Sequence, residues 1–223
     1  MSEPTPEPVT LYTNPFSRGR IVHLVLEEAK IPHRIVLLDF QTGEHKRPAF
    51  LAMNPMGKLP VIQHGPHVVL SETPAILTYL GDAFPDSGLL PPIGDPARAT
   101  VLKWLFFGAG CVEPVLNDKA FNRPPVGKGT VGWGTWEDVV ATLVAGLTPG
   151  PFFLGERLSL ADLFVGSQIA GGLHKKTLEP LPPFTRIVER LTALPSQERV
   201  QHKTIAMVKA LEERRAAASL LPG

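Results

Sequence analysis

The chain has 223 residues, of which 43% are hydrophobic and 19% are charged, so it is long enough for one large domain or two small ones. Its 22 basic and 21 acidic residues leave a net charge of +1, which indicates neither a nucleic-acid partner nor a membrane surface. The single cysteine, Cys111, excludes an intrachain disulfide and any multi-cysteine metal site.

The N-terminus is acidic and rich in proline, without the basic start and apolar run of a signal peptide. No apolar stretch reads as long enough to cross a bilayer. We therefore expect a flexible tail over residues 1–8 and a cytoplasmic protein.

The first third of the chain alternates between strand and helix patterns. Residues 9–13 form a short apolar strand candidate, residues 17–28 carry apolar side chains at helical spacing, and residues 34–39 form a second strand candidate. A crossover of this kind favours a parallel pair. Two further strands, 60–63 and 68–70, are separated by turn residues and predict a hairpin.

A helix is expected after the hairpin, with Thr73 as its N-cap and Pro74 at its first position. Proline and glycine then mark a linker over residues 85–94. Beyond it helical periodicity dominates, and we expect Pro114 to kink or end the first long helix. These patterns predict an α/β domain over 9–84 and an all-helical domain over 95–223, with helices near 97–118, 135–146, 159–174, 184–194 and 196–215.

Two motifs suit one small peptide-like ligand. In residues 54–62, a proline at the mouth of a strand leaves Leu59 with free backbone groups that can pair with an extended peptide. In residues 69–77, Glu72 and Thr73 precede a helix and offer a carboxylate, a hydroxyl and helix N–H groups. That end suits a ligand with an amine beside a carboxylate, as in glutathione.

With these motifs, residues 11–17 and the sequence of residues 158–162, the chain resembles the cytosolic glutathione transferase family, in its bacterial-type, theta-like serine class. The resemblance implies an α/β thioredoxin-like N-terminal domain followed by an all-α C-terminal domain. It also implies a detoxifying transferase that conjugates the glutathione thiolate to apolar electrophilic small molecules, with glutathione as co-substrate and no metal or separate cofactor.

Ser17 is the first candidate for activating the thiol. The thiol pKa should lie near ~8.5, and lowering it by about two units takes roughly 2.7 kcal/mol, which a hydroxyl donor and a helix N-terminus can supply. By resemblance Ser17 falls on the catalytic serine; the alternative is a plain N-cap serine. Asn14 is the second candidate, and Tyr12 reads more as a core aromatic. No cysteine lies near Ser17, which disfavours the members that exchange thiols.

The resemblance also implies the residues that bind glutathione. Glu72 and Thr73 would take its α-amine and α-carboxylate, and the main chain of Leu59 would pair with its cysteinyl amide, beside a cis peptide bond at Pro60. Lys58 and His45 are candidates for its glycyl carboxylate; for Glu72 and for His45, an ordinary solvated surface side chain is the alternative. The electrophile pocket is expected among Phe16, Met56, Phe106, Phe107 and Cys111, although core packing explains a helical phenylalanine equally well.

Ser159 and Asp162 match a capping box before an apolar run, which we interpret as structural. The helix from residue 95 carries Trp104 to Phe107, more apolar bulk than one buried stripe requires, and together with the resemblance this predicts a homodimer. Two other functions stay open. One is a glutathione-dependent isomerase, although the chain lacks the serine-serine-cysteine run typical of those relatives; the other is a non-catalytic binding or regulatory protein.

Overall fold

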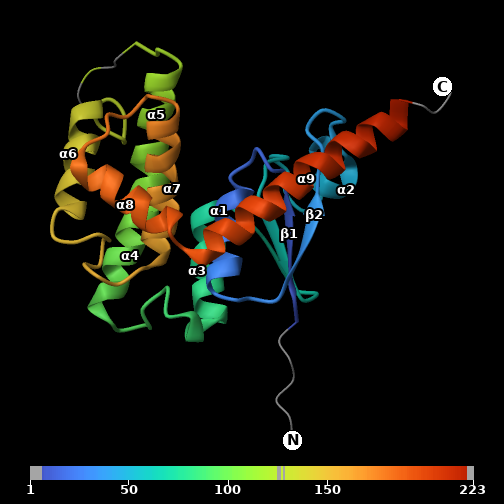
Figure 1. Ribbon diagram of the computed structural model, residues 1–223, viewed down its shortest axis with the longest axis horizontal. Helices are drawn as coiled ribbons and strands as arrows, with labels where there is room; N and C mark the ends of the chain where they lie inside the picture. Colours follow the sequence, from blue (N-terminus) through green and yellow to red (C-terminus); the bar gives the residue numbers. More distant parts are fainter. Residues whose placement is uncertain (1–6, 125–126, 128, 220–223) are drawn as a thin grey trace, which may run out of the picture. The chain divides into compact units, whose positions relative to one another are not determined.

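Four strands form one mixed sheet in the order β2-β1-β3-β4 (Figure 1). The computed structural model describes residues 7–124, 127 and 129–219, so most of the tail expected over 1–8 lies outside the described residues. β1 (Val9–Thr13) and β2 (His33–Leu37) run parallel and are joined by α1 (Gly19–Glu28). β3 (Val61–His64) runs antiparallel to both β1 and β4 (Val68–Ser71). The predicted crossover and hairpin are therefore confirmed.

Short helices complete this half of the chain. The 3-10 helix η1 (Glu44–Lys46) and α2 (Pro48–Leu51) fill the connection between β2 and β3. α3 (Thr73–Ala83) follows β4 and is the last helix before the 3-10 turn η2 (Pro85–Ser87). Thr73 is already helical, so the helix begins at the residue expected to be its N-cap, one position before Pro74. The central strand β1 alternates buried and half-buried residues, as a strand with one covered face should.

The second half is helical, as predicted. Its helices are α4 (Pro96–Phe107), the π-helical segment η3 (Gly108–Val112), α5 (Glu113–Ala120), α6 (Trp136–Leu147), α7 (Leu160–His174), α8 (Pro182–Thr192) and α9 (Pro195–Ser219). The capping box at the start of α7 is present, since Asp162 accepts the backbone N–H of Ser159 at 2.8 Å. Buried Trp104 stacks on Phe153 with 4.1 Å between ring centroids.

We expected Pro114 to kink or end the first long helix, and it does not end it. Helical structure continues from Pro96 to Ala120. The π segment before the proline accounts for this, because the Glu113 N–H bonds the carbonyl of Gly108, five residues back. A π turn shifts the hydrogen-bond pattern by one residue, which absorbs a position that has no N–H to donate.

This continuous stretch also corrects the expectation that no apolar segment is long enough for a bilayer. Its 25 residues include a window with a mean hydropathy of 1.4, so by length and composition it is the one helix in the described part of the chain that could cross a membrane. One such helix is weak evidence for a span, because the core helix of a soluble protein passes the same test.

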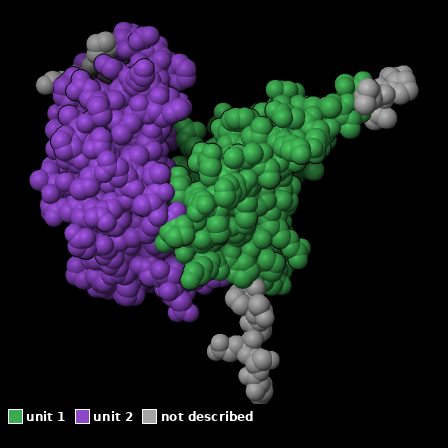
Figure 2. Space-filling model, in the orientation of Figure 1, with its two compact units in different colours: residues 1–79, 195–223 green, residues 80–194 purple. Residues whose placement is uncertain are grey.

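The chain divides into two compact units, coloured separately in Figure 2. Unit 1 combines Met1–Tyr79 with Pro195–Gly223, and unit 2 comprises Leu80–Leu194. The last helix, α9, packs against α1 and therefore belongs to the unit that contains the sheet. The sequence grouped this helix with the helical domain over 95–223. The expected domain and linker ranges themselves stay a prediction.

Candidate functional site

The sheet register brings the predicted binding motifs to one end of unit 1. Tyr12 of β1 lies opposite Val61 of β3, and Val61 lies opposite Ser71 of β4. The chain leaves β1 just after Tyr12, enters β3 at Val61 and leaves β4 at Ser71. The segments 14–17, 59–60 and 72–73 therefore all lie at the same end of the sheet, although up to 59 residues separate them in sequence.

Ser17 lies in the turn between β1 and α1. Its hydroxyl donates to the carbonyl oxygen of Asn14 at 2.8 Å and accepts the N–H of Gly19, the first residue of α1, at 3.1 Å. Arg18 occupies the assigned N-cap position and makes no side-chain cap, whereas the Ser17 hydroxyl accepts the N–H two residues on, so the N-cap interpretation of Ser17 stays an alternative. A half-buried hydroxyl beside the N-terminus of α1 is suited to donate to an anion placed there.

The Asn14 side chain is committed to its own loop. It is 1% exposed, its Oδ1 accepts the N–H of Phe16 at 3.0 Å, and its Nδ2 donates to the carbonyl of Leu38 at 2.8 Å. This amide ties the end of β1 to the segment after β2 and shapes the turn that carries Ser17. Tyr12 packs beside Phe50 at 6.3 Å between ring centroids, which agrees with its interpretation as a core aromatic.

The turn before β3 is rigidly organised. The peptide bond between Leu59 and Pro60 is cis, as the resemblance implied. The ladder of β3 begins at Val61, so Leu59 lies outside it. Asn54, which is 5% exposed, donates from its Nδ2 to the carbonyl of Lys58 at 2.9 Å. This hydrogen bond shapes the chain just before Leu59, while the Lys58 side chain extends into solvent.

Glu72 adopts a backbone conformation that is unusual for its residue type. Its φ is +68°, in the left-handed region that side chains other than glycine rarely enter. Strain of this kind gathers at ligand-binding and catalytic positions. Glu72 is exposed and directly precedes α3, and Thr73 behind it is 5% exposed. A carboxylate therefore stands beside free N–H groups of a helix N-terminus.

The segment with His45 lies against the turn before β3. Lys46 donates from its Nζ to the carbonyl of Met56 at 2.8 Å. A Cβ placed on Gly57 would lie 2.8 Å from the carbonyl oxygen of His45, which explains why a glycine with φ +59° stands there. The His45 ring meets Phe40 edge-on, and its buried Nδ1 has no hydrogen-bond partner within the described residues.

Sequence reasoning missed the residues of α9 that hold this segment. Arg215 binds Asp39 through two hydrogen bonds of 2.6 Å, and Arg214 is paired with Glu44. A hydrogen bond also joins Asp39 and Glu44 within this loop, because the Asp39 N–H donates to the Glu44 carboxylate at 2.8 Å. His45 follows directly. Because these partners lie about 170 residues apart, no local pattern reveals them.

The predicted electrophile pocket draws on residues of both units. Phe16, which is 77% exposed, and Met56 belong to unit 1, and the other three candidates belong to unit 2. Phe106 is 70% exposed, Phe107 packs edge-on against Trp104, and burial raises the pKa of the Cys111 thiol. Met56 is exposed. The pocket therefore stays a prediction.

The fold defines a class of protein: a thioredoxin-like sheet, with the predicted ligand residues at one end, combined with a helical unit. A family model described as "Glutathione S-transferase, N-terminal domain" matches residues 7–82. The chain is 31% identical over 193 residues to the probable glutathione S-transferase GSTF2 of Oryza sativa, covering 79% of this chain and 87% of that protein. The chain belongs to the glutathione S-transferase family.

Other relatives differ in their reactions. Maleylacetoacetate isomerase maiA of Aspergillus fumigatus is 26% identical, over 92% of this chain and 94% of that protein. Disulfide-bond oxidoreductase YfcG of Escherichia coli is 31% identical, over 70% of this chain and 76% of that protein.

Solved structures agree with this assignment. The glutathione transferase URE2P6 of Phanerochaete chrysosporium, in complex with oxidized glutathione, has a TM-score of 0.75 and 25% identity, and the match covers 90% of this chain and 98% of that one. A glutathione transferase homolog from Sulfitobacter with bound glutathione has a TM-score of 0.71 and 28% identity, covering 88% of this chain and 98% of that one.

Proposed function

We propose that the protein conjugates the thiolate of glutathione to electrophilic small molecules. The observation that carries the proposal is the shared sheet end, where the Ser17 turn, the Leu59-Pro60 turn and the start of α3 meet. Each supplies what one part of glutathione needs. The transferases named among the relatives, and the glutathione bound in similar structures, support the same substrate.

Glutathione binds by its two polar ends and its extended middle. The Glu72 carboxylate takes the α-amine of the γ-glutamyl group, and Thr73 with the N-terminal N–H groups of α3 takes the adjacent carboxylate. The main chain of Leu59 pairs with the cysteinyl amide, next to Pro60. Lys58 and His45 are the proposed partners of the glycyl carboxylate.

Ser17 activates the thiol in this proposal. Its hydroxyl turns from the carbonyl of Asn14 to the sulfur and donates a hydrogen bond that is stronger to the thiolate than to the thiol. The N-terminus of α1 adds a favourable potential for the anion. Asn14 acts through the loop that it fixes. The thiolate is the nucleophile, so the reaction uses glutathione as co-substrate and no further cofactor.

The second substrate is an apolar electrophile, and Phe16, Phe106, Phe107 and Cys111 are the proposed residues of its pocket. We further propose a detoxifying role in the cytoplasm and a twofold homodimer. The homodimer rests on the family relationship and not on Phe106, because that side chain, 70% exposed on α4, is already proposed for the pocket. Trp104 and Leu105 do not contribute, because both are buried in the core of unit 2.

A glutathione-dependent isomerase is the second candidate, favoured by the relative maiA that the chain matches over 92% of its length. An oxidoreductase like YfcG is a third activity among the relatives. A non-catalytic binding protein would lack turnover with any of these substrates.

One set of assays separates these functions. Retention on immobilised glutathione tests binding, and turnover of chlorodinitrobenzene tests conjugation. A maleyl substrate tests isomerisation, and a mixed disulfide tests thiol exchange. We expect retention and conjugation. If the protein is retained and turns over only the maleyl substrate, it is a glutathione-dependent isomerase. If it is retained and turns over none of the substrates, it is a binding protein.

A further inference from the structure

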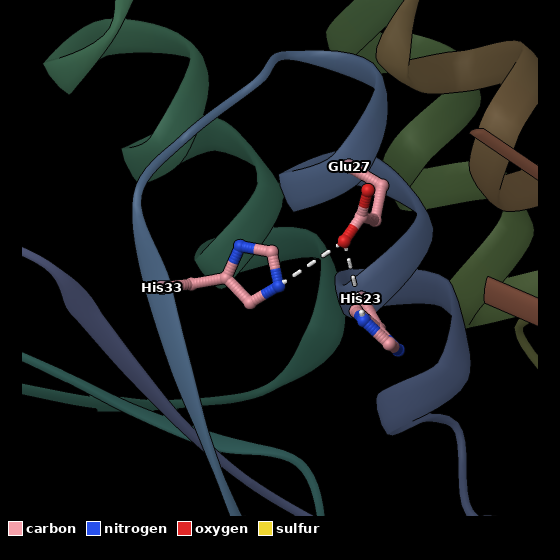
Figure 3. A group of neighbouring side chains, drawn as sticks. All are labelled: His23, Glu27 and His33. Carbon is pink, nitrogen blue, oxygen red and sulfur yellow. Dashed lines mark ion pairs between the residues drawn. The ribbon is translucent and has the colours of Figure 1, made fainter. Parts of the chain in front are cut away.

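Two histidines and a glutamate form a buried cluster in unit 1, at the other end of the sheet from the proposed glutathione site. His23 and Glu27 lie four residues apart on α1, and His33 is the first residue of β2 (Figure 3). Because β1 and β2 are parallel, the start of β2 and the exit of β1 lie at opposite ends. The conjugation reaction makes no use of these side chains.

The three side chains converge on the Glu27 carboxylate. Glu27 Oε1 lies 3.5 Å from His33 Nε2 and 3.8 Å from His23 Nε2. One potential ligand atom from each residue falls within a common span of 4.8 Å. In a tetrahedral site with bonds of about 2.0–2.1 Å, ligand atoms lie about 3.3 Å apart. Small side-chain movements bring this triangle to that size.

His33 is already oriented as a ligand. Its Nδ1 lies 2.7 Å from the carbonyl oxygen of Ile31. A carbonyl can only accept, so Nδ1 carries a hydrogen, and in the neutral ring the lone pair is then on Nε2, which faces Glu27. Metal-binding histidines in proteins have this arrangement, in which a second hydrogen bond fixes the tautomer and the ring.

His23 presents a polar atom with no partner. Its side chain is 2% exposed, and its Nε2 makes no hydrogen bond within the described residues. A neutral imidazole can donate the lone pair of such a nitrogen to a metal ion. A buried nitrogen without a partner costs free energy, and a bound cation would remove that cost.

Two cations from α9 already contact the carboxylate. Arg199 Nε lies 2.7 Å from Glu27 Oε2, and the Lys203 ammonium is paired with Oε1, the oxygen that faces the histidines. The Lys203 side chain is 49% exposed and can withdraw into solvent, while Arg199 keeps the carboxylate oriented.

We propose that His23, Glu27 and His33 bind a divalent transition-metal ion of the zinc type, which takes the place of Lys203 at Glu27 Oε1. Two imidazole nitrogens and one carboxylate oxygen suit zinc, nickel or copper, and water completes the coordination. This departs from the expectation of no metal, which the resemblance to the family implied.

Calorimetric titration of the full-length, tag-free protein with zinc chloride tests the site in the absence of glutathione, which itself binds zinc. We expect one ion per chain. His33→Gln should weaken the affinity about tenfold or more. Lys203→Met should raise it roughly twofold to fivefold, because it removes the competing ammonium. His67→Gln, at an exposed histidine of the hairpin turn, is the matched control and should leave it unchanged.

Equal zinc affinity in the wild type and a folded His33→Gln variant would overturn the proposal, as would loss of binding in His67→Gln. If His33→Gln fails to fold, nitrogen NMR spectra of the histidine side chains in the wild type, recorded with and without zinc, test the proposal instead. Zinc-dependent shifts of His23 and His33 support the site, and shifts confined to other histidines, or no shifts at all, refute it.

Discussion

Arg215, near the end of the chain, holds the carboxylate of Asp39 with two hydrogen bonds of 2.6 Å, from Nε to Oδ2 and from Nη2 to Oδ1. Asp39 is 2% exposed and follows β2 in the loop that leads to His45. The C-terminal helix thus supports a loop that carries a proposed glutathione ligand. The first prediction follows from this pair.

Arg215→Ala should destabilise unit 1 by about 1–3 kcal/mol, because it leaves a buried carboxylate with fewer donors. It should also raise the Michaelis constant for glutathione about fivefold, with less change in turnover, since the loop with His45 loses its support. Lys209→Ala is the control, because its ion pair with Glu213 is exposed and worth little. Urea unfolding measures the stability, and steady-state kinetics measure the Michaelis constant. An unchanged Michaelis constant would show that the loop with His45 does not take part in glutathione binding.

The same pair predicts a pH dependence. The Arg215 guanidinium lowers the pKa of Asp39 from 3.8 to about 2. A lowered carboxyl pKa means that the pair stabilises the folded state fully above about pH 4 and loses this contribution as the pH falls towards 2. The difference in unfolding free energy between wild type and Arg215→Ala should therefore be constant from pH 5 to 7 and shrink below pH 4. A difference that grows in acid would contradict this.

Glu72→Gln and Thr73→Ala should mainly weaken binding. Their proposed contacts are with the γ-glutamyl end, away from the sulfur, and exist equally in the ground state and the transition state. The Michaelis constant should therefore rise more than turnover falls. Initial rates over a range of glutathione concentrations check this. Collapse of turnover at unchanged affinity would place these residues at the reacting sulfur instead.

Asp162 predicts a stability effect confined to unit 2. Its carboxylate accepts the buried N–H groups of Phe153 at 2.7 Å and Ser159 at 2.8 Å. Asp162→Ala leaves both without an acceptor, at about 1–3 kcal/mol each. Thr135→Ala, at the exposed N-cap of α6, should cost only ~1 kcal/mol. Thermal unfolding compares the stability of the two variants. Equal losses of stability would show that the buried hydrogen bonds of Asp162 contribute no more than an ordinary N-cap.

Burial raises the pKa of Asp162 from 3.8 to about 6. The folded state therefore holds a proton between these values that the unfolded state has released, so this group's contribution to stability is present below pH 4 and is lost as the pH rises through 6. Asp162→Asn should remove that part of the slope. The comparison of unfolding free energies at pH 4 and 6.5 measures it, and identical slopes in both proteins would refute the assignment.

Local chemistry in the sequence predicted the sheet well. Turn residues located the hairpin, and the Ser159-to-Asp162 spacing located the start of α7. These features depend on residues close in sequence or on a known crossover rule.

Long-range pairing accounts for what the sequence did not predict. Glu27 meets Arg199 across 172 positions, and this contact, like that of Asp39 with Arg215, makes α9 part of unit 1. The sequence of a polar helix face does not indicate which distant residue each of its charged side chains will pair with. The π segment before Pro114 was missed for a related reason, since a proline by itself indicates a helix end.

Ser17→Ala should slow conjugation about tenfold or more while glutathione binding stays nearly intact. A hydrogen bond to a charged group is worth roughly 1.5–3 kcal/mol, and this one strengthens as the thiolate forms. Turnover of chlorodinitrobenzene, with glutathione affinity measured separately, provides the check. A variant that loses binding and keeps its turnover would assign Ser17 to the binding of glutathione instead.

The most direct test of the account is the pKa of glutathione bound to the enzyme, followed by the ultraviolet absorbance of its thiolate. We predict a value about two units below the free value of ~8.5 in the wild type, and a value close to the free one in Ser17→Ala. The same lowered pKa in both proteins would contradict the account, because the thiolate would then be stabilised without the Ser17 hydroxyl.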